Sequence, residues 1–196
     1  YPQNLNLYGD TGNVICLKRR CEWHDIELSI NNCQLSEKLQ TGETDIYFIG
    51  GGQDSDQIRV VDDFHTLKAA AVKADIENNA VFLGVCGGYQ LMGHTFLMGD
   101  GNLTKGLGII DIEAKAPGTA LKQRCIVNLI AELNEKDYKA ICKIYNPNEL
   151  KSSTYIPKTL VGFENHSGQT YLNQGNQELK PLAKTLKGFG NNATEG

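Results

Sequence analysis

The sequence predicts an α/β fold, with a three-layer, doubly wound and mostly parallel sheet and antiparallel additions in the C-terminal half. In residues 14–85, short apolar segments alternate with segments in which apolar residues recur at helical spacing. Strands that are separated by helices pair in parallel through crossover connections, so this order favours a doubly wound sheet. After about residue 105, long polar spacers join the strand-like segments instead. This change predicts antiparallel strands beside the parallel sheet.

The first expected elements are a helix and two strands. Apolar residues at 14, 17 and 21 follow helical spacing after a polar turn, which predicts a helix that begins at Thr11 or Asn13. Residues 26–30 alternate between apolar and polar side chains, as a half-buried strand does. A short apolar strand is expected at residues 45–49, where three glycines end it.

A second helix and the remaining strands complete the expected order. Phe64, Leu67 and Ala71 mark the helix, which should end near residue 79, before a strand at residues 80–85. Residues 135–158 predict a helix followed by a loop rich in proline, asparagine and serine. Further strands are expected at residues 108–114, 125–130 and 159–164.

Length and composition narrow the function classes. With 196 residues the chain is long enough for a three-layer core, and we expect one domain over residues 1–196. A net charge of -4 argues against a nucleic-acid-binding protein, which would have to neutralise phosphates. No apolar run approaches the length of a membrane-spanning helix, and no signal-peptide pattern is present.

The six cysteines show neither a C-x-x-C spacing nor a cluster with histidine, so we expect no metal site. Cys16 and Cys21 fall in the first helix and are expected in the core, and Cys33, Cys125 and Cys142 lack neighbours that would activate a thiol. The spacing is not that of a disulfide framework, which favours the reducing cytoplasm.

The sixth cysteine, Cys86, lies at the end of an apolar strand and directly before a helix that opens with glycines. The pattern G-x-C-x-G is the thiol counterpart of the nucleophile elbow, in which the nucleophile sits on a strained strand-to-helix turn. The following helix N-terminus would lower the pKa of the thiol. The alternative is a buried cysteine at a strand end, because free cysteine is among the most buried residue types. We favour the nucleophile.

Two glycine-rich loops follow strands and are candidates for an oxyanion site. Ligands bind at the carboxyl ends of the strands in open α/β sheets. A thiolate that attacks a carbonyl creates an oxyanion, which needs preorganised N–H donors. We expect Gly51, Gly52 and Gly87 to supply them. The alternatives for the triple glycine are a flexible turn and a phosphate cradle, although neither phosphate-binding glycine motif is present.

One of the four histidines has surroundings typical of a site. His166 lies in a G-F-E-N-H-S-G segment after a strand, where a histidine could hold the thiol proton. Its alternative is a loop histidine held by Asn165 or Ser167. His24 and His65 are expected in solvent, and His94 should point away from the elbow.

Four motifs in order along the chain resemble the class I, triad-type glutamine amidotransferases of the cobyric acid synthase/GatD type. They lie at residues 5–13, 50–54, 85–90 and 162–170. The last two recur in cobyric acid synthases, whereas the opening L-N-L-Y-G-D-x-G-N favours the GatD type. The resemblance spans nearly the whole chain.

This resemblance implies roles for individual residues. Cys86 would form a γ-glutamyl thioester and release ammonia, Gln90 would contact the bound glutamine, and Asn165 and His166 would line the pocket. The family's base belongs to a Y-x-H-G motif, which we expect beyond Gly196. The resemblance thus implies that the chain lacks its C-terminal end and first strand.

The family also holds the glutamine carboxylate with an arginine in a T-x-R-like stretch. Here Leu121 occupies that place, and Lys122 or Arg124 could serve instead.

The resemblance further implies a glutaminase subunit that delivers ammonia to a MurT-like, Mur ligase-type partner, which amidates D-glutamate of lipid II. This subunit would need no cofactor, whereas the partner would use ATP and Mg. The complex would be cytoplasmic, at the inner membrane face. The alternatives are a cobyric acid synthase-type amidotransferase domain and a catalytically silent, amidotransferase-like regulatory subunit.

Overall fold

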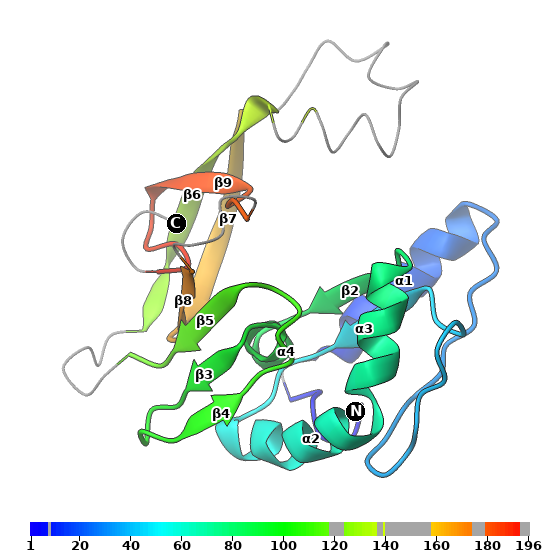
Figure 1. Ribbon diagram of the computed structural model, residues 1–196. Coiled ribbons are helices and arrows are strands. Elements are labelled where there is room, and N and C mark those ends of the chain that lie inside the picture. Colours follow the sequence, from blue (N-terminus) through cyan, green and yellow to red (C-terminus); the bar gives the residue numbers. More distant parts are fainter. Residues whose placement is uncertain (8, 118–123, 137–138, 140–157, 174–178, 193–196) are drawn as a thin grey trace. The chain divides into compact units, whose positions relative to one another are not determined.

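The computed structural model describes residues 1–7, 9–117, 124–136, 139, 158–173 and 179–192 (Figure 1). These residues form two compact units, Tyr1–Glu113 and Ala114–Gly196. The first unit contains helices and both parallel and antiparallel strands, and the second contains antiparallel strands. The α/β class and the antiparallel additions in the C-terminal half are thereby confirmed. The single domain over residues 1–196 stays a prediction.

A parallel strand pair lies at the centre of the first unit. Strand β1 (Ile46–Ile49) pairs in parallel with β2 (Val81–Gly84), with Ile46 opposite Val81 and Ile49 opposite Gly84. Helices α2 (Asp54–Leu67) and α3 (Ala69–Glu77) form the connection between them. Both strands and the helical connection agree with the sequence prediction. The parallel arrangement brings the carboxyl ends of β1 and β2, and the loops that follow them, to one edge.

The rest of the first unit follows β2. Helix α4 (Gly87–Met92) leads into the antiparallel pair β3 (Thr95–Leu97) and β4 (Leu103–Lys105). Strand β5 (Ile112–Lys115) crosses the boundary between the two units and replaces the longer strand expected at residues 108–114. The hydrophobic core joins β1, α2, α3 and α4 through residues such as Ile49, Val60, Val72 and Leu91.

The N-terminal segment departs from the prediction in two ways. Helix α1 (Thr11–Trp23) begins where expected but buries none of its residues, so Cys16 is exposed and Cys21 half-buried instead of in the core. Residues 26–30 form no strand, and Ile26 and Ile30 are exposed. An alternating segment becomes a strand only beside another strand, and among the described residues none pairs with it.

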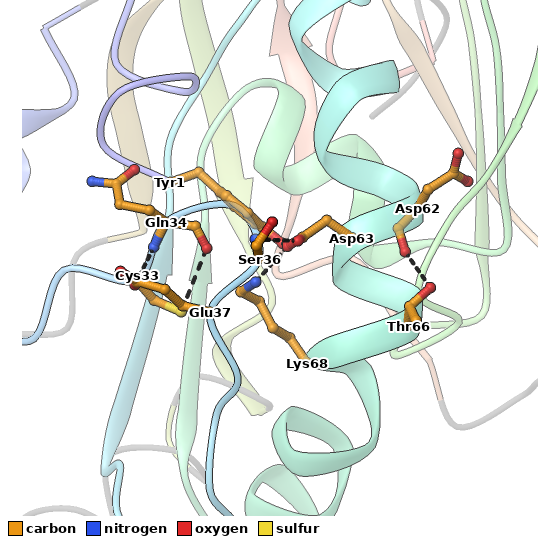
Figure 2. Close-up of polar contacts among 9 residues, drawn as sticks. All are labelled: Tyr1, Cys33, Gln34, Ser36, Glu37, Asp62, Asp63, Thr66 and Lys68. Carbon is orange, nitrogen blue, oxygen red and sulfur yellow. Dashed lines mark hydrogen bonds and ion pairs between the residues drawn. The ribbon is translucent and has the colours of Figure 1, made fainter.

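The predicted second helix is two helices, because the chain leaves helical geometry at Lys68. The Lys68 side chain is 2% exposed and pairs with Asp63. Its Nζ also lies 4.9 Å from the centre of the Tyr1 ring, and the Tyr1 hydroxyl donates to Asp63 at 2.7 Å. The Ser36 N–H donates to the same carboxylate at 2.6 Å. Figure 2 shows how these side chains surround Asp63. We call these four residues the Lys68 cluster.

The Lys68 cluster stabilises the charged form of Asp63. Burial works to raise the pKa of Asp63, but hydrogen bonds from Lys68, Tyr1 and Ser36 outweigh it and hold the pKa below its usual value. The carboxylate therefore ties the N-terminal residue and the loop at Ser36 to α2, whose hydrophobic face packs into the core.

The second unit is built on an antiparallel sheet in the order β7-β6-β9. Strand β6 (Cys125–Leu133) pairs with β7 (Thr159–His166) and with β9 (Ala183–Lys187), and β8 (Gln169–Leu172) follows β7. The predicted strands at 125–130 and 159–164 are thus present and slightly longer. Cys142, Leu121, Lys122 and most of the segment at 135–158 lie outside the described residues.

Candidate active site

Cys86 occupies a sharp turn between β2 and α4, two residues after the last residue of the strand and directly before the first residue of the helix. Its backbone angles are φ 53° and ψ -112°, a combination that residues with a Cβ rarely adopt. The side chain is exposed. The alternative of a buried cysteine at a strand end is therefore wrong, and the strained turn expected of a nucleophile elbow is present.

The two outer glycines of the G-x-C-x-G pattern have no room for a side chain. A Cβ on Gly88 would lie 2.2 Å from the carbonyl oxygen of Ile49 in β1, and one on Gly84 would lie 2.8 Å from the Gly88 oxygen. Close contact between the helix and both strands thus requires glycine at these two positions. The Gly88 N–H also donates to Gly50 O at 3.1 Å and to Val85 O at 3.0 Å. The turn is fixed by backbone contacts.

The triple-glycine loop lies against the elbow and is held from the N-terminal segment. The Gly51 N–H donates to the buried Asp10 carboxylate at 3.0 Å. This contact counts against Gly51 as an oxyanion donor, because its only N–H is already engaged. The assignments of Gly52 and Gly87 stay predictions. Asp10 belongs to the opening L-N-L-Y-G-D-x-G-N motif, but the sequence alone gave it no role in the site.

A second glutamine, which the sequence analysis did not single out, lies beside Gln90. Gln57 is on the first turn of α2 and is 2% exposed. Its Nε2 donates to Gln90 Oε1 at 3.0 Å and to Gly52 O at 3.4 Å. A Cβ on Gly87 would come within 2.8 Å of the same nitrogen. The first unit therefore brings together Gly52, Cys86, Gly87 and Gln90 of the predicted site, and Gln57 lies next to three of them, Gly52, Gly87 and Gln90.

The second unit brings together the other predicted residues. The Arg124 guanidinium donates to Asn165 Oδ1 at 3.0 Å, so the candidate cation and the candidate pocket residue are direct neighbours. His166 is the last residue of β7 and not a loop residue. One ring nitrogen lies 2.9 Å from Gly168 O and the other 3.3 Å from Glu164. Neither Asn165 nor Ser167 holds this ring among the described contacts.

Glu164 connects the F-E-N-H segment to the glycine-rich segment at residues 188–192. Its buried carboxylate accepts the N–H of Phe189 at 2.6 Å and that of Gly190 at 3.0 Å. Gly188 has φ 112°, and a Cβ there would lie 2.6 Å from the same carboxylate. These two segments lie more than twenty positions apart in the sequence. The structure shows that one carboxylate joins them and also orients His166.

The remaining candidates have ordinary structural roles. His94 pairs with Asp111 at 3.0 Å and His65 lies 3.3 Å from Lys105 O. Burial raises the pKa of the thiols of Cys33 and Cys125, which makes them weak nucleophiles. Within the described ranges, no group of three histidine, cysteine, aspartate or glutamate residues could hold a metal ion. No helix in the same ranges has both the length and the apolar composition needed to cross a membrane.

Comparison of the sequence with known proteins identifies its family. The sequence matches the CobB/CobQ-like glutamine amidotransferase domain over residues 1–196. It is 31% identical over 188 residues to the GatD subunit of the glutamine-hydrolysing lipid II isoglutaminyl synthase of Staphylococcus aureus, covering 96% of this chain and 65% of that protein. The same subunit of Streptococcus pneumoniae is 31% identical over 192 residues, covering 98% and 64%.

A cobyric acid synthase is also similar, over a shorter stretch. The probable cobyric acid synthase of Methanococcus maripaludis is 31% identical over 121 residues, covering 59% of this chain and 19% of that protein. The chain spans slightly less than two thirds of the length of the GatD relatives. The match over all 196 residues and the glycine-flanked cysteine turn lead to one assignment: the chain belongs to the CobB/CobQ-like glutamine amidotransferase family.

Proposed function

We propose that this chain hydrolyses glutamine through a covalent intermediate on Cys86 and supplies ammonia to a ligase partner. The observation that carries the proposal is the backbone of Cys86, which combines a positive φ with an exposed side chain at a strand-to-helix turn. A cysteine kept for packing gains nothing from that conformation, whereas a nucleophile gains access to the substrate. The family supports glutamine as the substrate.

The chemistry follows from the position of the sulfur. After loss of the thiol proton to a base, the sulfur attacks the side-chain carbonyl carbon of glutamine, and the carbonyl oxygen becomes an oxyanion. The N–H groups of Gly52 and Gly87 are the proposed donors to it. Collapse breaks the carbon–nitrogen bond, the nitrogen takes a proton and leaves as ammonia, and a γ-glutamyl thioester remains. Water then hydrolyses the thioester to glutamate and restores the thiol.

The glutamine would extend from Cys86 to polar side chains that bind its other end. Gln90 supports this, because it lies one helical turn after the cysteine and its N–H bonds to Cys86 O at 3.0 Å. Arg124, Asn165 and His166 are the further proposed binding residues, and the contact of Arg124 with Asn165 shows that a cation is available beside that segment. A guanidinium is suited to the substrate carboxylate.

The proposed acceptor is the D-glutamate of lipid II, amidated by a MurT-like, Mur ligase-type subunit that uses ATP and Mg. Support comes from coverage: the GatD relatives match 96–98% of this chain, whereas the cobyric acid synthases match 59–65%. We place the complex in the cytoplasm, associated with the inner membrane face through the partner. Ammonia lost to water is wasted, so hydrolysis should depend on the partner.

The test uses protein from the complete gene, with and without a co-expressed Mur ligase-type partner. Glutamate release from glutamine is measured, and an electrophilic glutamine mimic, diazo-oxo-norleucine, is added for intact-mass and peptide analysis. We expect one adduct per chain, on Cys86, and loss of both adduct and release in Cys86→Ala. Cys33→Ala is the matched control and should keep both, because burial makes its thiol a weak nucleophile.

The outcomes separate the candidate functions. Unchanged glutamate release in Cys86→Ala would refute the nucleophile. No release by the wild type with its partner would favour a catalytically silent regulatory subunit. If release occurs but the complex amidates a corrinoid carboxylate and not lipid II, the cobyric acid synthase-type function would replace the one proposed.

A further inference from the structure

We propose that Gln57 is a positioning residue, which fixes the side-chain amide of Gln90 so that its NH2 group faces the glutamine substrate. The inference rests on the proposed function, because it specifies how the same site recognises its ligand. It concerns a residue 29 positions before Cys86 that belongs to no motif identified in the sequence.

The contacts of Gln57 determine which end of its amide faces the site. Gly52 O is a backbone carbonyl and can only accept, so the atom 3.4 Å from it must be the Gln57 nitrogen. The same nitrogen lies 3.0 Å from the Gln90 amide. Since Nε2 of Gln57 can only donate, the Gln90 atom that faces it must be the oxygen. The Gly52 carbonyl thus orients the amide of Gln57, which in turn orients the amide of Gln90.

This orientation leaves the Gln90 nitrogen as the end that can bind a ligand. The oxygen of Gln90 is turned inward to Gln57, and the hydrogen bonds found among the described residues include none from the Gln90 side-chain nitrogen. Gln90 follows Cys86 by one helical turn, so the two residues lie on the same side of α4. The ligand group that it fits is an acceptor, a carbonyl or carboxylate oxygen of the amino-acid substrate.

The surroundings of Gln57 indicate that hydrogen bonding, more than packing, accounts for this side chain. Its own Oε1 is buried and has no partner in the described part of the chain, which is an unfavourable arrangement that an apolar side chain of the same length would avoid. The nitrogen also packs against Gly87, where a Cβ would lie 2.8 Å away. Gln57 therefore touches the loop, the residue after the nucleophile and Gln90 from one buried position.

A purely structural link between the loop and α4 is the competing explanation, and glutamine affinity separates the two. Gln57→Met keeps the length of the side chain and removes both hydrogen bonds along with the unpartnered oxygen. We expect the KM for glutamine to rise about tenfold, the loss expected of one oriented hydrogen bond, with kcat changed less than about threefold. In a Gln90→Ala background the same substitution should raise KM no further.

Asp75→Asn is the matched control for substituting a buried polar residue of the first unit. Asp75 accepts from the Tyr47 hydroxyl at 2.6 Å and from the Gly42 N–H at 2.7 Å, and neither partner belongs to the proposed site. This variant should lower stability and leave KM unchanged. Glutamine binding to Cys86→Ala, measured by calorimetry with and without Gln57→Met, gives the same comparison without turnover, and we expect about a tenfold weaker Kd.

Two results would overturn the inference. One is an unchanged KM and Kd in Gln57→Met, and the other is an equal rise in KM when Gln90 is already alanine. Failure of the proposed function looks different, because then the wild type and Asp75→Asn would also neither release glutamate nor bind glutamine. If Gln57→Met does not fold, Gln57→Glu replaces it. A carboxylate at position 57 can only accept, so it should rotate the Gln90 amide to present its NH2 group to position 57, and the KM for glutamine should rise. An unchanged KM in Gln57→Glu would also refute the role of Gln57.

Discussion

Alanine at position 88 should separate α4 from β1 and damage both stability and activity. Gly88 is the second residue of α4, and its missing side chain allows the helix to touch the end of β1. An ideal Cβ there would lie 2.2 Å from Ile49 O, 2.8 Å from Ile49 C and 2.9 Å from Ile49 Cγ2. Real Cβ atoms essentially never approach within 3.0 Å, so the helix must retreat by at least about 0.8 Å.

The size of the effect follows from what the helix would have to leave. Ile49 O also accepts the Val85 N–H at 2.9 Å, and the Gly88 N–H donates to Gly50 O at 3.1 Å, so the movement strains two backbone hydrogen bonds. Overpacking of this kind typically costs about 1–3 kcal/mol, and a rigid backbone contact favours the upper end. Alanine returns roughly 1 kcal/mol of helix propensity. We expect a net loss of about 2 kcal/mol in the free energy of unfolding.

Urea unfolding followed by circular dichroism measures the loss, and Gly12→Ala provides the control. Gly12 lies in α1 with nothing within 4 Å of an added Cβ, so alanine there should stabilise the protein by up to ~1 kcal/mol. Glutamate release and labelling of Cys86 should fall in Gly88→Ala, because the elbow moves with the helix. A Gly88→Ala protein as stable and as active as the wild type would refute the reasoning about the turn.

Two further predictions concern the carboxylates of Asp63 and Glu164, which each accept several hydrogen bonds. Asp63→Asn leaves the Lys68 ammonium buried without its partner and should cost about 3 kcal/mol near neutral pH. The pKa of Asp63 is lower in the folded protein, so the stabilisation by its carboxylate is complete above the unfolded pKa near 4 and disappears as the pH falls through the folded value. Urea unfolding at decreasing pH measures this. The difference in the free energy of unfolding between Asp63→Asn and the wild type should close only in acid. Glu164→Gln places an NH2 group against the N–H of either Phe189 or Gly190. The free energy needed to open this segment locally should fall by roughly 1–3 kcal/mol. Hydrogen exchange at Phe189 and Gly190 should then accelerate at least about tenfold, and unchanged exchange would contradict the anchoring role.

Local patterns were enough for the elements that build the elbow. Strands β1 and β2 are short apolar runs bounded by polar or glycine residues, and α2 carries helical apolar spacing, so each is specified by its own segment. The cysteine turn was predictable for the same reason, since its flanking glycines are required by contacts within a few residues and with the adjacent strand. Glycines that are required by local contacts can be recognised from the sequence itself.

Elements that depend on a distant partner were not predictable from the sequence. Residues 26–30 have the alternation of a strand, but a strand also needs a neighbouring backbone, and alternation does not show whether one is present. The break at Lys68 depends on Asp63 and on Tyr1, which is far away in the chain. The amphipathic pattern of α1 likewise predicted burial, whereas the structure buries none of its residues.

The residues of the candidate site also divide into those set by a local motif and those set by distant contacts. Cys86 and Gln90 could be named because they lie in one short motif, whereas Gln57 reaches Gln90 across 33 positions and Asp10 reaches Gly51 across 41. Glu164 was visible as a motif letter, but its hydrogen bonds to residues 189 and 190 were not. The engagement of the Gly51 N–H by Asp10 could be seen only when the two segments were placed together.

The contacts of the elbow also explain how the chain keeps a cysteine in an unfavourable conformation. A non-glycine residue in such a backbone state costs roughly 1–3 kcal/mol and persists only where its surroundings over-determine it. Here the Val85 N–H bonds to Ile49 O at 2.9 Å before the turn, and the Gln90 N–H bonds to Cys86 O at 3.0 Å after it. Neither of these two bonds involves the sulfur, so both can persist while the sulfur forms and breaks a covalent bond. A nucleophile that is acylated in every cycle needs a turn that is held in this way.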